Sequence, residues 1–238
     1  MSSSMVRGTQ LSALFLIGLV SGQAGAVDGT TFGLGAGASG GGASIYFPIR
    51  TGSLIIEPRI SYFHNERKSD GSDVQVIDYP PAYPEPQQTW TGTSQWVATS
   101  ETKELGLGLF SRNQITEEIE IYFGGRFGIR TFKSRANNRS DQTVAPSGYV
   151  HISIGDSIDK QDGYFLAPSF GLQYFPRPNF SFGIEVAFEY SNLSGSVDFS
   201  SSRTTDDPRY STESRSGTRN SDTENYGTVT AAILRGYF

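Results

Sequence analysis

The segment FSFGIEVAFEY, residues 180–190, alternates between two kinds of side chain. One parity carries aromatic and branched aliphatic residues, and the other carries serine, glycine, alanine and two glutamates. A period of two is the pattern of a β-strand whose two faces meet different surroundings. What this chain folds into therefore depends on whether the aromatic face packs into a core or faces something apolar outside.

The same period recurs along the chain and predicts eight strands. Their expected ranges are 30–38, 43–49, 53–64, 101–111, 118–133, 163–175, 180–192 and 224–238. After the first hairpin, short connections at 48–52, 112–117 and 176–179 alternate with long polar loops expected at 65–100, 134–162 and 193–223. Up-and-down antiparallel strands place every second connection at the same end, so short turns and long loops gather at opposite rims. This layout predicts an all-β fold, an eight-stranded antiparallel up-and-down transmembrane β-barrel.

The N-terminus has the features of a secretory signal peptide. Arg7 precedes an apolar run at 11–20, and Ala24 and Ala26 stand where signal peptidase requires small residues. The run is about half as long as a bilayer-spanning helix needs to be. We therefore expect residues 1–26 to be removed by cleavage after Ala26, leaving a barrel domain over 27–238.

Composition excludes several classes of function. The net charge is −5 and no long run of Lys and Arg occurs, which argues against nucleic acid as a partner. The chain has no cysteine, so it has no disulfide, thiolate nucleophile or cysteine metal site. Neither a metal nor another cofactor is predicted. Sixteen Phe and twelve Tyr against two Met are typical of a surface at a boundary between water and lipid.

The face opposite the apolar one carries charges. They are Glu57, Arg59, Glu120, Arg126, Arg130, Glu185, Glu189 and Arg235. If the apolar face were inside, these charges would be solvated and the protein would be a soluble, lipocalin-like barrel. If it were outside, four carboxylates and four guanidinium groups would fill the interior and roughly neutralise one another.

Two observations favour the apolar face being outside. Strands of about 10–12 residues, tilted near 40°, span roughly 25 Å, which is the height of the apolar band of an outer membrane. Aromatic residues also gather beside the short turns, as a lower interfacial girdle requires. The predicted girdle consists of Phe47, Tyr174, Phe180, Phe182 and Tyr237, with Phe175 and Phe238 beside them.

The C-terminal stretch AAILRGYF resembles the closing strand of bacterial outer-membrane barrels. Together with the signal peptide and the strand plan, it makes residues 27–238 similar to the small eight-stranded barrel family typified by OmpA and OmpX, although Gly236 departs from the aromatic pattern. The resemblance implies a Gram-negative outer membrane, periplasmic termini and extracellular long loops. It also implies contact with outer-membrane lipid and lipopolysaccharide, and an assembly signal at Phe238 and Leu234 for the barrel-assembly machinery.

An eight-stranded barrel has an interior just wide enough for side chains to fill. Buried charges persist when they are paired, and an arginine fork suits a carboxylate. Arg126 and Arg130 face the same way at two heights, so each can meet an acid. We therefore expect a charge-plugged barrel that acts as a structural, surface-interaction protein of the adhesion type. A narrow ion or small-solute channel is the alternative.

The long loops are where a specific partner would bind. Four rings in the first of them, Tyr79, Tyr83, Trp90 and Trp96, are predicted contacts for a host or surface ligand.

A lipid A-modifying enzyme is the second alternative. His151 and Ser153 form an H-x-S pair that resembles the catalytic pair of lipid A deacylase barrels. No acid is placed beside the pair by any pattern, so we expect the protein not to be an enzyme.

Overall fold

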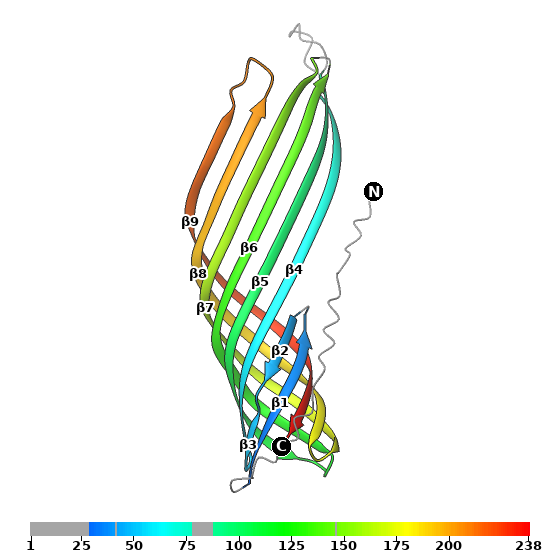
Figure 1. Cartoon of the computed structure of the whole chain (residues 1–238), viewed down its shortest axis with the longest axis vertical. Helices are drawn as coiled ribbons and strands as arrows, with labels where there is room; N and C mark the ends of the chain where they lie inside the picture. The colour runs from blue at the N-terminus through cyan, green and yellow to red at the C-terminus, as the bar shows by residue number, and fades with distance from the viewer. Residues whose placement is uncertain (1–28, 41, 78–87, 146) are drawn as a thin grey trace.

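The computed structural model describes residues 29–40, 42–77, 88–145 and 147–238, and nearly all of them lie in strands. The strands are β1 (Thr30–Ser39), β2 (Gly42–Tyr46), β3 (Ile49–Thr51), β4 (Leu54–Ile77), β5 (Gln88–Gln114), β6 (Ile119–Ala145), β7 (Tyr149–Arg177), β8 (Phe180–Thr205) and β9 (Glu213–Tyr237). Neighbours are antiparallel, and β1 pairs with β9, so the sheet closes into a ring (Figure 1). In the described ranges, no helix is long and apolar enough to cross a membrane. The predicted cleavage site after Ala26 lies outside them, as do Tyr79 and Tyr83.

The short strands β2 and β3 are two halves of one barrel strand. Each pairs with β1 on one side and with β4 on the other. The break falls at Phe47 and Pro48, where the proline has no amide hydrogen to donate to a neighbouring strand. The Phe47 amide still donates to the Pro58 carbonyl at 2.9 Å. Counted around its circumference, the ring has eight strands, which confirms the predicted barrel.

The prediction of long polar loops was wrong. The segments expected to be loops continue the strands, and β4–β5 pair without a register shift from Leu54 opposite Ser111 to Ile77 opposite Gln88. The hairpins β6–β7 and β8–β9 likewise pair through most of the polar stretches. These stretches are polar on both faces, so they lack the hydrophobic alternation by which strands are recognised. Their Thr, Val, Trp and Tyr residues nevertheless favour extended pairing.

Only the lower half of the ring is closed. The β1–β2 hairpin reaches no higher than its pairing with Phe63 of β4 and Ala232 of β9. Above these points, residues 64–77 of β4 and 213–231 of β9 each pair with a single described strand. Six strands, β4–β9, therefore continue upward as an open, curved sheet (Figure 1).

The outward surface of the lower half is apolar, which answers the question raised by residues 180–190. On β8, Ile184 is 58% exposed, whereas its neighbour Glu185 is buried inside the ring. From Phe180 to Tyr190 the strand rises by ten residues, which at about 3.4 Å each and a tilt near 40° gives about 26 Å. The apolar band thus has the height of a membrane interior.

Rings of aromatic side chains border this band. At its upper edge lie the outward-facing Tyr62, Tyr164, Tyr190 and Tyr226, and ring centroids of Tyr190 and Tyr226 are 5.0 Å apart. At the lower edge, Phe47, Phe180 and Phe182 are exposed as predicted, and half-buried Tyr174 packs edge-on against Phe182 at 5.2 Å.

Tyr237 and Phe175 do not belong to the lower girdle. Both rings are buried inside the ring, and the Tyr237 hydroxyl donates to Gln173 Oε1 at 3.1 Å. The physical reason is the strand period: Tyr237 shares the inward parity of Arg235, so it cannot face lipid alongside Phe238. The prediction that placed both final aromatic residues in the girdle was wrong for Tyr237.

Candidate functional site

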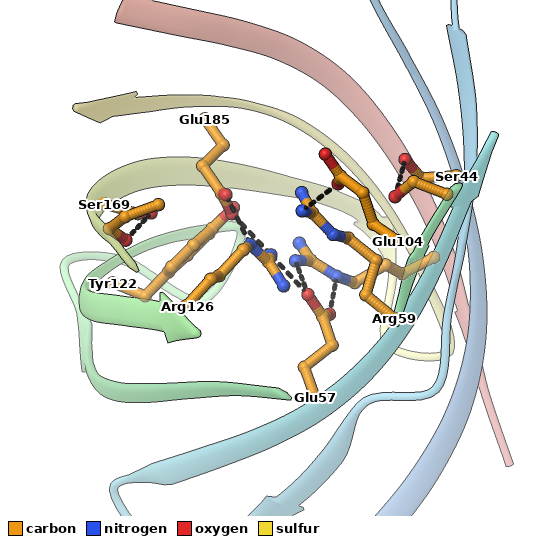
Figure 2. Close-up of polar contacts among 11 residues, drawn as sticks. Ser44, Glu57, Arg59, Glu104, Tyr122, Arg126, Ser169 and Glu185 are labelled. Atoms are coloured by element: carbon orange, nitrogen blue, oxygen red, sulfur yellow. Dashed lines mark hydrogen bonds and ion pairs between the residues drawn. The ribbon is translucent and has the colours of Figure 1, made fainter. Parts of the chain in front are cut away.

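The centre of the barrel is a cluster of ion pairs built on Arg126 of β6 (Figure 2). Its Nη2 donates to Glu57 Oε1 of β4 at 2.6 Å, and its Nε and Nη2 donate to the two oxygens of Glu185 of β8 at 2.7 and 2.8 Å. The Tyr122 hydroxyl donates to Glu185 Oε2 at 3.0 Å. One arginine thus ties three strands together across the lumen.

Arg235 of β9 completes this central layer. Its Nε and Nη2 donate to Glu57 Oε2 and Oε1 at 2.6 and 3.0 Å, so Glu57 lies between two guanidinium groups and is 0% exposed. Aromatic faces cover both cations: Arg126 lies 4.8 Å from the Phe110 ring, and Arg235 lies 5.2 Å from the Tyr122 ring. Such stacking suits a guanidinium group that has lost its water.

An upper layer lies on the other side of Phe165. Arg59 Nη2 donates to Glu104 Oε2 at 2.6 Å, and Arg130 Nε donates to Glu104 Oε1 at 2.8 Å. Arg130 Nη2 also donates to Glu189 Oε1 at 2.6 Å. The Phe165 ring supports both cations, at 5.2 Å from Arg59 and 5.4 Å from Arg130.

A lower layer lies near the short turns. Arg50 and Arg112 both pair with Glu120 Oε2, the latter at 2.9 Å. Arg50 is stacked on Phe175 and Tyr237, at 5.0 and 4.8 Å. Below this layer a cavity of about 350 Å³ opens at the turn end of the barrel.

The eight charges predicted for the interior all lie there, but their partners differ in part. Arg59 pairs with Glu104, which was not predicted, and Glu120 pairs with Arg50 and Arg112, which were not predicted either. Glu104 had a usable signal, because in ELGLGL it stands on the parity opposite Leu105. Arg50 of β3 and Arg112 of β5 also lie on the inward parity, opposite Ile55 and Tyr122, but both fall in stretches that were expected to be short connections.

The three layers together occupy the lumen with charge in near balance. Their acids are Glu57, Glu104, Glu120, Glu185 and Glu189, and their bases are Arg50, Arg59, Arg112, Arg126, Arg130 and Arg235. Within the part of the chain that the structure describes, the buried atoms of these layers without a hydrogen-bond partner are Arg50 Nε, Arg59 Nε, Arg126 Nη1, Arg235 Nη1 and Glu120 Oε1. Chemically, the arrangement can cross-link the walls and block passage, and it contains no nucleophile beside a base.

The closing strand presents its predicted assembly residues outward. Leu234 and Phe238 are both exposed on the outer face of the barrel. The Phe238 amide donates to the Phe32 carbonyl of β1 at 2.9 Å, so the last residue takes part in closing the ring.

The two predicted contact residues that the structure describes, and the H-x-S pair, lie on strands of the upper sheet instead of in loops. Trp90 and Trp96 belong to β5, and His151 and Ser153 belong to β7. Buried His151 stacks on Trp90 with centroids 5.2 Å apart and meets the edge of Tyr210 at 5.9 Å. Its Nδ1 has no hydrogen-bond partner among the described residues. These contacts give His151 a packing environment.

No family model and no curated protein matches the chain. Solved structures with similarity include a major outer membrane protein from Thermus thermophilus, at 15% identity over 88% of this chain and 99% of that one, with a TM-score of 0.36. CarO from Acinetobacter baumannii matches at 8% identity over 87% and 97%, with a TM-score of 0.36. Neisserial surface protein A matches at 13% over 88% and 94%, with a TM-score of 0.35. At these TM-scores the likeness says nothing about the function of this protein.

Proposed function

We propose that this protein is an integral outer-membrane barrel whose sealed lower half anchors a tall polar sheet that makes contacts at the cell surface. One observation carries the proposal: the outward face changes from apolar to polar at the tyrosine ring, while the strands continue far beyond it. An apolar band about 26 Å high has to be covered by hydrocarbon, and the polar strands above it then stand in water.

The direction of insertion follows from the two ends. The short turns and the C-terminal residue lie together at the lower end (Figure 1). In outer-membrane barrels short turns are periplasmic and long connections are extracellular. We therefore place the lower end in the periplasm and the open sheet outside the cell, where a surface-interaction role of the adhesion type belongs.

Cysteine labelling tests this placement sharply, because the natural chain has no cysteine. A single cysteine at Ser202, high on β8, should react with a membrane-impermeant maleimide on intact cells. A cysteine at Glu117, in a lower turn, should react only after the outer membrane is permeabilised. The opposite pattern, or recovery of the protein from the soluble periplasm, would remove the proposal. Adhesion is tested by comparing how cells bind to host-component arrays with and without the sheet above the tyrosine ring.

A narrow channel is the second candidate function. The unpartnered buried atoms of Arg126, Arg235 and Glu120 favour it, because such groups are commonly satisfied by water. A row of water molecules bound between the three ion-pair layers would form part of a path for ions through the lumen. Planar-bilayer recordings decide between anchor and channel.

We expect no enzymatic activity. The support is the packing of His151 between Trp90 and Tyr210, with exposed Ser153 two residues away on the same strand. If lipid A acylation in the host changed when Ser153 was replaced by alanine, the enzyme alternative would take precedence.

A further inference from the structure

The two faces of the upper sheet differ in charge. The convex face of β5–β8 is charged along its length, with Lys103, Lys133, Arg135, Arg139, Lys160 and Asp198 among its side chains. The concave face continues the parity of the barrel interior. Across 94–102, 132–142, 153–161 and 191–201 its one charge is Asp159, which accepts hydrogen bonds from Gln161 Nε2 at 3.0 and 3.1 Å.

Small hydroxyl and amide side chains line much of the concave face, together with a few apolar residues such as Leu193 and Val197. On β6 they are Ser134, Asn138, Ser140 and Gln142, with Ala136 between them. Groups of this kind exchange hydrogen bonds with neutral hydroxyl groups without imposing a charge. Over these central stretches the charges lie mainly on the outer face and neutral donors and acceptors lie inside, which suits a neutral, hydroxyl-rich ligand. Other charged residues of the concave parity, such as Asp73, Arg203 and Arg215, lie on the edge strands or near the tip.

Aromatic platforms stand on the same face. Trp96 of β5 is 39% exposed and Phe199 of β8 is 41% exposed. Trp96 is flanked along its strand by the small residues Ser94 and Ala98, which leave part of its ring exposed on this face. Aromatic faces that pack against the C–H face of a sugar, beside amides that bind its hydroxyl groups, form a carbohydrate-binding surface.

The sheet is also open on one side, and the opening begins at the top of the apolar band. The β1–β2 hairpin ends where Gly42 pairs with Phe63, next to Tyr62 of the upper tyrosine ring. Where the hairpin ends, two strands separate β4 from β9, which corresponds to about 14 Å at three strand spacings, and above this level the two edges face an open gap. A chain rooted in the outer leaflet can enter the concave face sideways through this gap.

Two arginines border the gap. Arg67 of β4 is five residues above Tyr62, and Arg219 of β9 is seven residues above Tyr226. Both are exposed on the inward parity, and neither makes an ion pair with a described residue. Guanidinium groups without acidic partners fit phosphate groups. Lipopolysaccharide carries phosphate groups beside its sugar chain, and Arg67 lies in the same row of the sheet as Ala98 and Ala136 of the concave face, so both kinds of group would find partners here.

We propose that the concave face of the upper sheet binds the sugar chain of a lipopolysaccharide molecule rooted in the same leaflet, with its phosphates at Arg67 and Arg219. This inference rests on the proposed outer-membrane placement, which cysteine labelling tests independently. If labelling places the sheet outside the cell and no sugar binds, the inference fails while the proposed function stands.

Intrinsic fluorescence offers a direct test, because the only two tryptophans, Trp90 and Trp96, both lie on the concave face of β5. A Trp90→Phe variant in detergent leaves Trp96 as the reporter. Titration with host lipopolysaccharide should give a saturable change, and the delipidated polysaccharide should bind about tenfold more weakly. Because Trp96→Ala removes the fluorescent reporter, its binding is measured by calorimetry. The variant should bind lipopolysaccharide and the delipidated polysaccharide about tenfold more weakly than the parent.

Adjacent residues on opposite faces supply a matched control. Ala136→Glu places a carboxylate on the concave face and should abolish binding, whereas Asn137→Glu places the same charge on the convex face and should leave it unchanged. Heat-modifiable migration in detergent gels checks the folding of each variant. If Ala136→Glu fails to fold, the double variant Arg67→Ala, Arg219→Ala, at two exposed positions, tests the inference in its place. It should weaken binding of intact lipopolysaccharide but leave binding of the delipidated polysaccharide unchanged.

Three results would overturn the inference. The first is the absence of a saturable change with either lipopolysaccharide or its polysaccharide. The second is equal affinity in the parent, the Trp96→Ala variant and the Ala136→Glu or double-arginine variant. The third is equally tight binding of unrelated neutral hexasaccharides, which would make the occupant a foreign glycan instead of the neighbouring lipopolysaccharide.

Discussion

Arg235 Nε donates to Glu57 Oε2 at 2.6 Å, joining the last strand to β4 across 178 residues of sequence. The pair lies inside the barrel, and the β1 and β2–β3 strands separate β4 from β9 along the wall. The contact therefore forms only when the ring is closed. Its neighbour Arg126 links the same carboxylate to β6.

Removing Arg126 should destabilise the barrel strongly. Arg126→Ala leaves Glu57 with one cation and Glu185 with none, and breaking a buried pair typically costs about 3–5 kcal/mol. The measurement is urea unfolding in detergent, followed by heat-modifiable migration. Arg135→Ala is the control, because Arg135 pairs with Asp156 on the exposed upper surface at 3.1 Å and should change stability by less than about 1 kcal/mol. Equal stabilities would mean that the central layer does not hold the walls together.

A charge on the lipid face should be costly only within the apolar band. Ile184→Arg places a guanidinium group near the midplane and should cost about 2–4 kcal/mol. Ser196→Arg, on the same parity of β8 but above the tyrosine ring, should change stability by about 0.5 kcal/mol or less. The same unfolding assay compares them. A harmless Ile184→Arg would show that inside and outside had been assigned the wrong way round.

The unmodified barrel should not conduct. Three layers of paired side chains occupy the lumen, and planar bilayers containing the protein should show no steady current at neutral pH. The double variant Glu104→Ala, Arg130→Ala removes most of the upper layer, and with Arg126→Ala it should produce flickering current. Steady conductance from the parent would favour the channel over the anchor.

Deleting Phe238 should impair insertion but not export. The residue lies on the outward face and closes the ring through its amide. Because it resembles the terminal aromatic residue of outer-membrane barrels, we propose that it is part of the assembly signal. The expected result is processed protein that accumulates in the periplasm without heat-modifiable migration. Phe238→Tyr keeps an aromatic terminus and should assemble normally. Full barrel yield without Phe238 would contradict the prediction.

The tip between β8 and β9 should loosen in acid. Arg209 donates to Asp207 Oδ1 and Oδ2 at 3.0 and 2.8 Å, and these hydrogen bonds lower the pKa of Asp207. Because the folded pKa lies below the unfolded value of about 3.9, the contribution is complete above about pH 4 and is lost as pH falls through the folded pKa. Hydrogen exchange of residues 206–212 should therefore accelerate below pH 4. Asp207→Asn should exchange at a rate that does not vary with pH in this range once intrinsic exchange is taken into account.

Much of the lower half could be predicted from alternation alone. Wherever one face meets lipid, the period of two is visible, so the inward charges and the outward Phe180 and Ile184 were placed correctly. The upper half could not be found in this way, because a strand with water on both sides has no alternation between apolar and polar residues. β-Propensity and backbone pairing with neighbouring strands hold this half together, and neither produces a periodic pattern in the sequence.

Errors within the site have the same origin. Tyr237 was misplaced because an aromatic residue beside a turn was assigned to the girdle before its parity was considered. Glu120 was expected to pair with Arg59, Arg126, Arg130 or Arg235. Its partners are Arg50 on β3 and Arg112 on β5, both of which fall in stretches that were expected to be short connections. The pairing of Arg59 with Glu104 needs the tilt of the barrel as well as its parities.

The unbroken register of β5 and β6 has a mechanical consequence. Residues 89–114 and 120–145 pair without a shift from the tip to the lower turn. A pull on the tip would therefore load the ladder of hydrogen bonds in shear along its whole length, with no hinge at the membrane surface to bend first. The force would reach the barrel wall distributed over many hydrogen bonds, which would suit the proposed role in adhesion.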